Sequence, residues 1–243
     1  MTTTTQTVRE IALAQPTSIR VFEQYGIDYC CGGRKPLSEA CAASNLEVDA
    51  VLAALDSAAQ GPAPIAEDWT KASLERLSDH IASTHHTYVK RELPRLAELA
   101  VKVVRRHGET QAELPAIQAK LALLDAELTQ HLAKEEAILF PYIGALERSV
   151  AAGSELPHGC FASVASPIAM MLSEHDAAGT LLAEIRQLSH QFTTPVGACP
   201  TYHAFYDGLH EFEQDLHQHI HLENNILFPN AIELETRASQ LNG

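Results

Sequence analysis

The sequence predicts an all-α protein in which a small helical domain precedes a four-helix bundle. Four long stretches carry the apolar spacing of α-helices, at residues 73–106, 114–148, 167–192 and 200–236. No stretch alternates apolar and polar residues with the two-residue period of a half-buried strand. Four helices of this length, with residues 149–166 as a long connection between two helix pairs, are typical of a bundle.

A segment with two prolines and a glycine separates the bundle from the N-terminal residues. Such a composition interrupts helices. We therefore expect a small helical domain at residues 1–60, a linker at 61–72 and the bundle at 73–243. Within the small domain, Gly26 is expected to end the second helix. The expected short helices are 7–14, 17–25, 37–43 and 46–59.

Prolines mark several expected helix starts and irregularities. Pro115, Pro167 and Pro200 lie where helices could begin, with Ser166 as a candidate N-cap. Three prolines inside the helical patterns are expected to kink or break them: Pro94, Pro141 and Pro229.

The composition argues against several classes of function. The formal net charge of −14 disfavours binding to nucleic acid or to anionic lipid. No apolar run reaches the roughly 18 residues of a membrane-spanning helix, and the first residues lack a signal-peptide pattern. Five cysteines fit free thiols better than a disulfide framework. We expect a cytoplasmic protein without nucleic-acid or membrane partners.

An internal repeat indicates that the bundle is a duplicated helix pair. The stretch from His131 to Pro141 matches the stretch from His219 to Pro229 at six of eleven positions, with an offset of 88 residues. His86 and His175 are 89 residues apart. Each copy therefore supplies one histidine followed by a His-x-x-x-Glu motif.

The histidines and glutamates of this repeat lie on the apolar stripes of the predicted helices. Residues three and four apart share one face of a helix, so these polar residues are expected to face the core. The predicted stripes are Ala82, His86, Val89, Leu93, Leu96 and Ala100; Ile117, Leu121, Leu124, Leu128, His131, Glu135 and Ile138; Ile168, Met171, His175, Ala178, Leu182 and Ile185; and Phe205, Leu209, Phe212, Leu216, His219, Glu223 and Ile226.

Two glutamates in a core are costly unless cations compensate them. Imidazole and carboxylate ligands suit non-haem iron, and carboxylates from facing bundle helices commonly hold two metals. We expect two iron ions bridged by Glu135 and Glu223, with two histidines on each and room for an oxo or hydroxo bridge. Zinc or manganese, or a bundle without metal, are the alternatives. The candidate ligands are His86, His131, Glu135, His175, His219 and Glu223.

The neighbouring histidines leave one assignment open. His85 could replace His86 as the ligand, although the apolar stripe favours His86. Three other nearby histidines fall off the stripes and are not expected to be ligands: His80, His217 and His221.

Two adjacent cysteines follow the second short helix. The segment Asp28–Gly33 reads Asp-Tyr-Cys-Cys-Gly-Gly, and its glycines permit positive φ or close backbone approach. Adjacent cysteines do not readily form a disulfide with each other. Cys30 and Cys31 are candidate functional thiols that could bind a soft metal, exchange disulfides or pair with another chain. The alternative is a structural turn with one buried thiol.

The Asp-Tyr-Cys-Cys-Gly-Gly segment ahead of two His-x-x-x-Glu motifs resembles the iron–sulfur cluster repair di-iron proteins of the RIC, or ScdA/YtfE, type. The resemblance covers essentially the whole chain. It implies a hemerythrin-like bundle preceded by an ScdA-type domain, and the same six metal ligands. It also implies a stress-response protein that repairs clusters damaged by nitric oxide or oxidative stress.

The function expected from this resemblance is repair by iron donation or nitric oxide handling, more than conventional enzymatic turnover. A nitric-oxide-binding or nitric-oxide-reducing protein is the alternative, and an oxygen carrier is disfavoured because two histidines serve each iron. Damaged iron–sulfur proteins and nitric oxide are the expected partners, and a homodimer remains open.

Overall fold

The computed structural model describes residues 2–60 and 68–241, and their regular structure is helical. Within these ranges no strand forms, and Thr7 pairs with Pro36 as an isolated antiparallel bridge. The chain divides into two compact units, Met1–Ala72 with Ile220–Pro229, and Ser73–His219 with Asn230–Gly243. The all-α class predicted from the sequence is confirmed.

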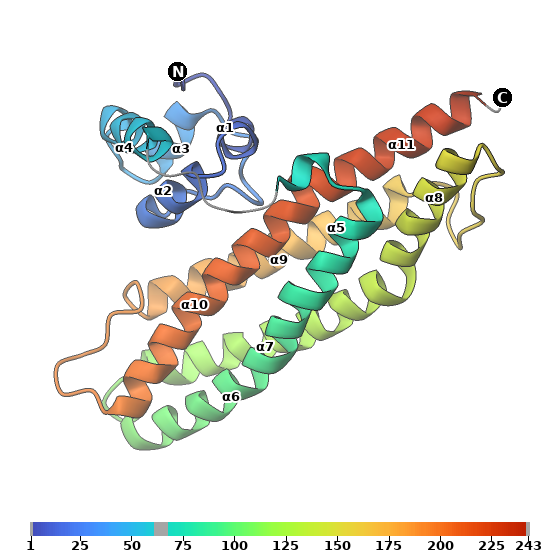
Figure 1. Cartoon of the computed structure of the whole chain (residues 1–243). Helices are drawn as coiled ribbons and strands as arrows, with labels where there is room; N and C mark the ends of the chain where they lie inside the picture. Colours follow the sequence, from blue (N-terminus) through green and yellow to red (C-terminus); the bar gives the residue numbers. More distant parts are fainter. Residues whose placement is uncertain (1, 61–67, 242–243) are drawn as a thin grey trace. The chain divides into compact units, whose positions relative to one another are not determined.

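The N-terminal unit contains four short helices (Figure 1). Thr7 caps the first helix in a capping box with Glu10, and Gly26 ends the second with a φ of 64°. A buried apolar core, which includes Phe22, Tyr29 and Leu55, joins the four helices. The helices are α1 (Val8–Ala14), α2 (Ser18–Tyr25), α3 (Leu37–Ala43) and α4 (Val48–Gln60).

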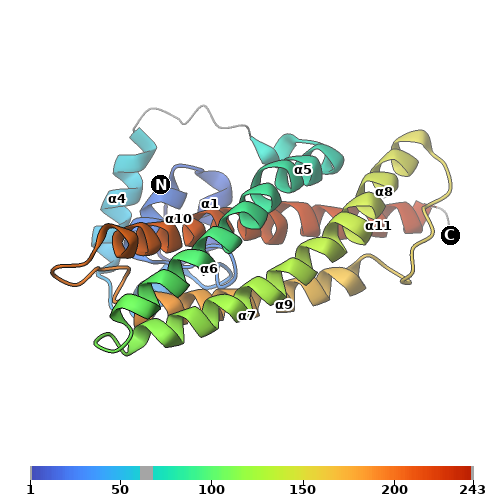
Figure 2. The same ribbon diagram turned by 90° about the horizontal axis from the view of Figure 1, so that it is seen from below.

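The second unit is built mainly from four long helical runs. In both views α6, α7, α9 and α10 run alongside one another (Figures 1 and 2). None of the described helices is both long and apolar enough to cross a membrane. From residue 69 onward the elements of the chain are η1 (Trp69–Lys71), α5 (Leu74–His80), η2 (Ile81–His86), α6 (Thr87–His107), α7 (Glu113–Lys134), η3 (Glu135–Leu139), α8 (Phe140–Ala152), α9 (Ala165–Leu188), α10 (Pro200–Leu222), η4 (Glu223–Leu227) and α11 (Phe228–Leu241). Of these, η1, η4 and the adjoining ends of α10 and α11 are part of the first unit.

The third run begins two residues earlier than the sequence suggested. Ser166 was predicted to cap a helix starting at Pro167, but α9 starts at Ala165. The carboxylate of Glu235, on α11, accepts a hydrogen bond from the backbone N–H of Val164 at 3.0 Å. The hydroxyl of Ser163 accepts one from the N–H of Ala165 at 3.2 Å. A distant carboxylate therefore caps this helix, which local sequence cannot reveal.

A π-helical turn lies beside a candidate metal ligand in three of the four runs. η2 ends at His86, η3 begins at Glu135 and η4 begins at Glu223. In η3 the N–H of Phe140 donates to the Glu135 carbonyl, five residues earlier, and Phe228 does the same to Glu223 in η4. Single π turns inside α-helices often occur at functional sites.

None of the three internal prolines ends its helical run. α6 continues through Pro94. Pro141 and Pro229 are the second residues of α8 and α11, directly after π turns. A proline lacks the N–H that would bond four residues back, and the altered bonding of a π turn places that loss at an existing irregularity.

These turns also change which residues face the core. Almost every residue of the four predicted stripes is buried, but two are not. Ile138 is 45% exposed while Leu139 is 2% exposed, and Ile81 is buried while Ala82 is half-buried. The prediction was wrong at Ile138 and Ala82, because a π turn holds one more residue than an α turn and shifts the phase of the stripe.

We predict that Leu139→Ala lowers the free energy of unfolding by about 2–5 kcal/mol, because it leaves a cavity in the core. Ile138→Ala, the matched control on the neighbouring residue, is expected to cost about 1 kcal/mol or less. Urea denaturation followed by circular dichroism measures both values. A larger loss for Ile138→Ala would contradict the π turn at η3.

Candidate metal centre

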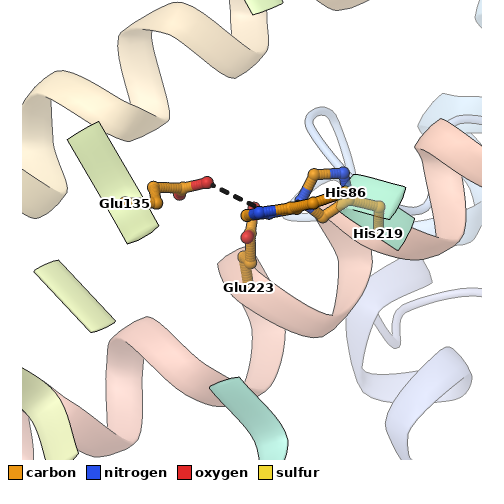
Figure 3. A group of neighbouring side chains, drawn as sticks. All are labelled: His86, Glu135, His219 and Glu223. Atoms are coloured by element: carbon orange, nitrogen blue, oxygen red, sulfur yellow. Dashed lines mark hydrogen bonds and ion pairs between the residues drawn. The ribbon is translucent and has the colours of Figure 1, made fainter. Parts of the chain in front are cut away.

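The structure brings all six predicted ligands together in two overlapping groups. The potential ligand atoms of each group lie within 4.8 Å of one another, and all six residues are buried. Glu135 and Glu223 belong to both groups. Figure 3 shows the first group, in which the carboxylate of Glu135 is directed toward His86. The groups are His86, Glu135, His219 and Glu223, and His131, Glu135, His175 and Glu223.

The histidines of each group face each other through their Nε2 atoms. These atoms are 3.2 Å apart in His86 and His219, and 3.0 Å apart in His131 and His175. Two nitrogen ligands at right angles on one metal, each with a bond of about 2.1 Å, would be about 3 Å apart. The spacing of each pair therefore fits a shared metal ion.

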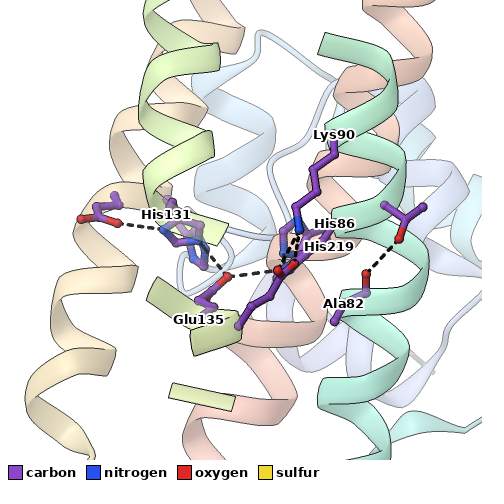
Figure 4. Close-up of polar contacts among 10 residues, drawn as sticks. Ala82, His86, Lys90, His131, Glu135 and His219 are labelled. Carbon is purple, nitrogen blue, oxygen red and sulfur yellow. Dashed lines mark hydrogen bonds and ion pairs between the residues drawn. The ribbon is translucent and has the colours of Figure 1, made fainter. Parts of the chain in front are cut away.

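Glu135 lies between the two groups. Its Oε2 atom is 3.5 Å from Nε2 of His86 and 3.3 Å from Nε2 of His131. Figure 4 shows His86 and His131 on either side of this carboxylate. One oxygen atom thus approaches a histidine of each group, which is the placement that a carboxylate shared by two metals requires.

We refer to the six candidate ligands together as the cage. A carboxylate outside the cage fixes the orientation of one histidine in each group. Nδ1 of His86 lies 2.9 Å from Oε1 of Glu136, and Nδ1 of His131 lies 2.9 Å from Oε2 of Glu174. A carboxylate accepts hydrogen bonds, so each Nδ1 carries the proton. In the neutral ring, Nε2 then presents its lone pair to the cage, which is the tautomer that a metal needs.

A lysine holds each outer carboxylate in its charged form. Nζ of Lys90 lies 2.6 and 2.7 Å from the two oxygens of Glu136, and Lys134 forms an ion pair with Glu174. Burial by itself raises the pKa of both glutamates. The hydrogen bonds from the lysine and the histidine outweigh burial and hold each pKa below its ordinary value.

Two histidines close to the ligands in sequence, His85 and His221, are buried but stand outside both groups. Nδ1 of His85 is 3.0 Å from Oδ1 of Asp215, and His85 belongs to neither group. The structure therefore favours His86 over His85 at this position. His221, which lies off the predicted stripe, is 4% exposed, and its Nδ1 lies 2.8 Å from the side-chain nitrogen of Asn225.

The cysteine loop is organised around Asp28. Its Oδ1 accepts hydrogen bonds from the N–H groups of Cys30 and Cys31, both at 2.9 Å, and its Oδ2 accepts one from Gly32 at 2.8 Å. A Cβ added at Gly33 would lie 2.7 Å from the Tyr29 carbonyl oxygen. A close backbone approach, which glycine permits, therefore occurs at Gly33, and neither Gly32 nor Gly33 has a positive φ.

The two thiols of the loop differ in accessibility. Cys30 is buried, Cys31 is half-buried, and their sulfur atoms are 3.7 Å apart. The hydrogen bond to Cys31, burial and the nearby Asp28 raise the pKa of the Cys30 thiol well above its ordinary value. Potential ligand atoms of Asp28, Cys30 and Cys31 lie within 4.8 Å of one another.

Comparison with known proteins shows to which family the chain belongs. Residues 4–59 match ScdA_N, a domain of unknown function (DUF542), and residues 77–231 match the hemerythrin HHE cation binding domain. The iron–sulfur cluster repair protein YtfE of Yersinia pseudotuberculosis serotype IB (strain PB1/+) is 40% identical over 227 residues. The match covers 93% of this chain and 96% of that relative. The chain belongs to the YtfE family of hemerythrin HHE proteins.

This membership confirms the family resemblance and the order of the two domains seen in the sequence. The iron–sulfur cluster repair protein YtfE of Yersinia pestis (strain Pestoides F) matches with the same identity and coverage. A cation-binding family and two buried groups of histidine and glutamate together fit a metal site in this bundle.

Part of the site could not be identified from the sequence. The residues that orient the ligand histidines lie outside the predicted ligand set: Glu136, Glu174, Lys90 and Lys134. Each lysine follows a candidate histidine by four or three residues on the same helix, a spacing that could have indicated a shared acidic partner. Glu127, four residues before His131 on the same helix, is exposed and stands outside both groups.

We predict that Glu136→Ala and Glu174→Ala each weaken metal binding by about 10- to 100-fold, because the carboxylate that orients a ligand histidine is lost. Competition with a chelator measures the affinity. Glu127→Ala removes an exposed glutamate from the same bundle and is expected to leave the affinity unchanged. Equal affinities for all three variants would contradict the assigned role of the outer carboxylates.

Proposed function

We propose that the protein repairs iron–sulfur clusters damaged by nitric oxide or oxidative stress, using a di-iron centre held in the bundle. The observation that carries the proposal is the pair of buried groups that share Glu135 and Glu223. Relatives that match along nearly the whole chain are iron–sulfur cluster repair proteins. The damaged clusters of other proteins are then the substrate.

We propose iron as the metal, with Glu135 and Glu223 as bridging ligands. Two imidazoles and shared carboxylates for each ion, with coordination positions left over, suit non-haem iron better than the closed tetrahedral sites of structural zinc. When bound, the iron pair would supply exchangeable iron and open positions for small ligands such as nitric oxide. His86 and His219 would hold one ion, and His131 and His175 the other.

The residues around the cage would keep two of its histidines in the tautomer that binds metal. Glu136 and Glu174 retain the protons on Nδ1 of His86 and His131, so that neither ring has to change tautomer when metal enters or leaves. Lys90 balances the charge of Glu136 at the edge of the cage. The lysine-held carboxylates thus support reversible loading, which an iron donor needs.

For the cysteine loop we propose that Cys31 is the thiol that meets a client. Cys31 is the more exposed of the pair, and the raised pKa of Cys30 disfavours its thiolate. Cys30 would then serve as the neighbouring thiol that supports Cys31 through their contact at 3.7 Å.

A second function, the binding or reduction of nitric oxide, is supported by the sharing of both glutamates between the groups. Two adjacent metal positions could hold two nitric oxide molecules close together, which favours their coupling. With two electrons from an external reductant and two protons, the coupling would give nitrous oxide and water. Formation of nitrous oxide over many turnovers would favour this function over repair. The even division of histidines between the two groups disfavours an oxygen carrier of the asymmetric kind.

We predict that iron-loaded protein restores the activity of a client enzyme whose cluster has been damaged by nitric oxide, whereas metal-stripped protein does not. The client's activity and its cluster absorbance measure the recovery. The matched control is metal-stripped protein to which iron has been returned, and it should recover the effect. Equal repair by stripped protein would contradict iron donation.

We also predict that Cys31→Ser slows this repair more than Cys30→Ser, because Cys31 is the more accessible thiol. The same client assay measures both variants, and iron content serves as the control that each bundle is intact. A larger loss with Cys30→Ser would contradict the proposed roles of the two thiols.

A further inference from the structure

The two copies of the internal repeat differ directly after their shared glutamates. In the first copy Glu135 is followed by Glu136 and Ala137, and in the second copy Glu223 is followed by Asn224 and Asn225. Glu136 contacts His86 of the cage. The two asparagines lie in η4, are both buried, and belong to the same compact unit as the cysteine loop.

Both asparagines hold the backbone of the cysteine loop. The side-chain nitrogen of Asn224 donates to the carbonyl of Cys30 at 3.2 Å, and that of Asn225 donates to the carbonyl of Tyr29 at 3.0 Å. Tyr29 also packs edge-on against His221, with ring centroids 5.4 Å apart. The π turn that begins at Glu223 therefore makes two direct hydrogen bonds to the loop that carries the thiols.

Arg9 adds a third connection, at a place where the helix itself lacks a donor. Pro229 has no N–H, so the carbonyl of Asn225, four residues earlier, cannot receive its usual helical hydrogen bond. Nη2 of Arg9 donates to this carbonyl at 3.1 Å. The backbone N–H of Arg9 donates to the carbonyl of Gly33, at the end of the cysteine loop, at 2.7 Å.

We propose that Asn224, Asn225 and Arg9 are positioning residues that couple the metal site at Glu223 to the cysteine loop. Metal bound by Glu223 would restrict the motion of the first residue of η4. Through their hydrogen bonds, the asparagines would then restrict the backbone of Tyr29 and Cys30. The loop would then be held more closely when the cage is loaded and released more readily when it is empty. The inference deepens the proposed function and rests on metal binding by Glu223.

Such a connection must act in both directions. If metal binding favours the closely held loop, a modification that holds the loop away from this state must weaken metal binding. The first copy lacks this connection, since Ala137 has no side-chain donor and Glu136 is engaged with His86 and Lys90. This connection to the cysteine loop is thus a property of the second copy of the repeat.

The test is the rate at which iodoacetamide labels the peptide that contains Cys30 and Cys31 in the full-length protein. Mass spectrometry follows the labelling with and without Fe(II), under anaerobic conditions. We expect labelling to be at least about fivefold slower in the loaded wild type, within the range usual for coupled sites. In Asn224→Ala/Asn225→Ala the loaded and metal-free rates should become equal. Asn230→Ala, an exposed asparagine just past the same turn, should behave as wild type.

A second variant and the reciprocal measurement guard against a simple folding defect. Arg9→Gln leaves both asparagines in place and should reduce the rate difference partly. Wild-type protein already labelled at the loop should bind Fe(II) more weakly than unlabelled protein, and an unchanged affinity would overturn the coupling. A structural defect in one variant would not produce this matched change in the wild type.

The outcomes separate the inference from the function on which it rests. A wild type that takes up no Fe(II) would overturn both. Normal uptake with equal or faster labelling in the loaded protein would overturn the coupling alone. Protection that persists in Asn224→Ala/Asn225→Ala would also overturn it, because metal would then be protecting the thiols directly.

Discussion

The rest of the structure depends on two fully buried glutamates that lie among the same potential metal ligands. Glu135 and Glu223 have no exposed surface, and each belongs to both groups of potential metal ligands. Bringing charged carboxylates into a core costs several kcal/mol each unless opposite charge compensates them. The four surrounding histidines, two of them oriented by outer carboxylates that lysines hold, are arranged as a metal ion would require. The bundle helices therefore hold two carboxylates in a core where, without a compensating cation, their burial would be unfavourable.

The same local irregularity of the helix positions each of the two glutamates. In both repeats the glutamate begins a π turn, and a proline follows six residues later. The π turn shifts the helix phase, so that Leu139 takes the core position expected for Ile138. In the second copy, the carbonyl that Pro229 leaves without a helical donor receives the side chain of Arg9. An irregularity needed for the site therefore also provides a point of attachment for the cysteine loop.

Much of this was accessible from the sequence, because it depends on periodicity. The bundle helices, the Gly26 helix stop and the convergence of all six candidate ligands follow from apolar spacing and from the internal repeat. Features set by distant contacts were not accessible. Glu235 caps α9 from another helix, and Glu136 orients a histidine 50 residues away. The π turns were missed for a different reason, since a regular 3.6-residue period carries no sign of an added residue.

The most direct test of a shared-carboxylate metal pair is metal analysis with Mössbauer spectroscopy of anaerobically purified protein. Wild type is compared with Glu135→Ala/Glu223→Ala and with Glu127→Ala as the control. The account predicts two magnetically coupled irons per chain in wild type and control, and their loss in the double variant. One iron, zinc, or two uncoupled irons in the wild type would contradict it, as would a double variant that keeps the coupled pair.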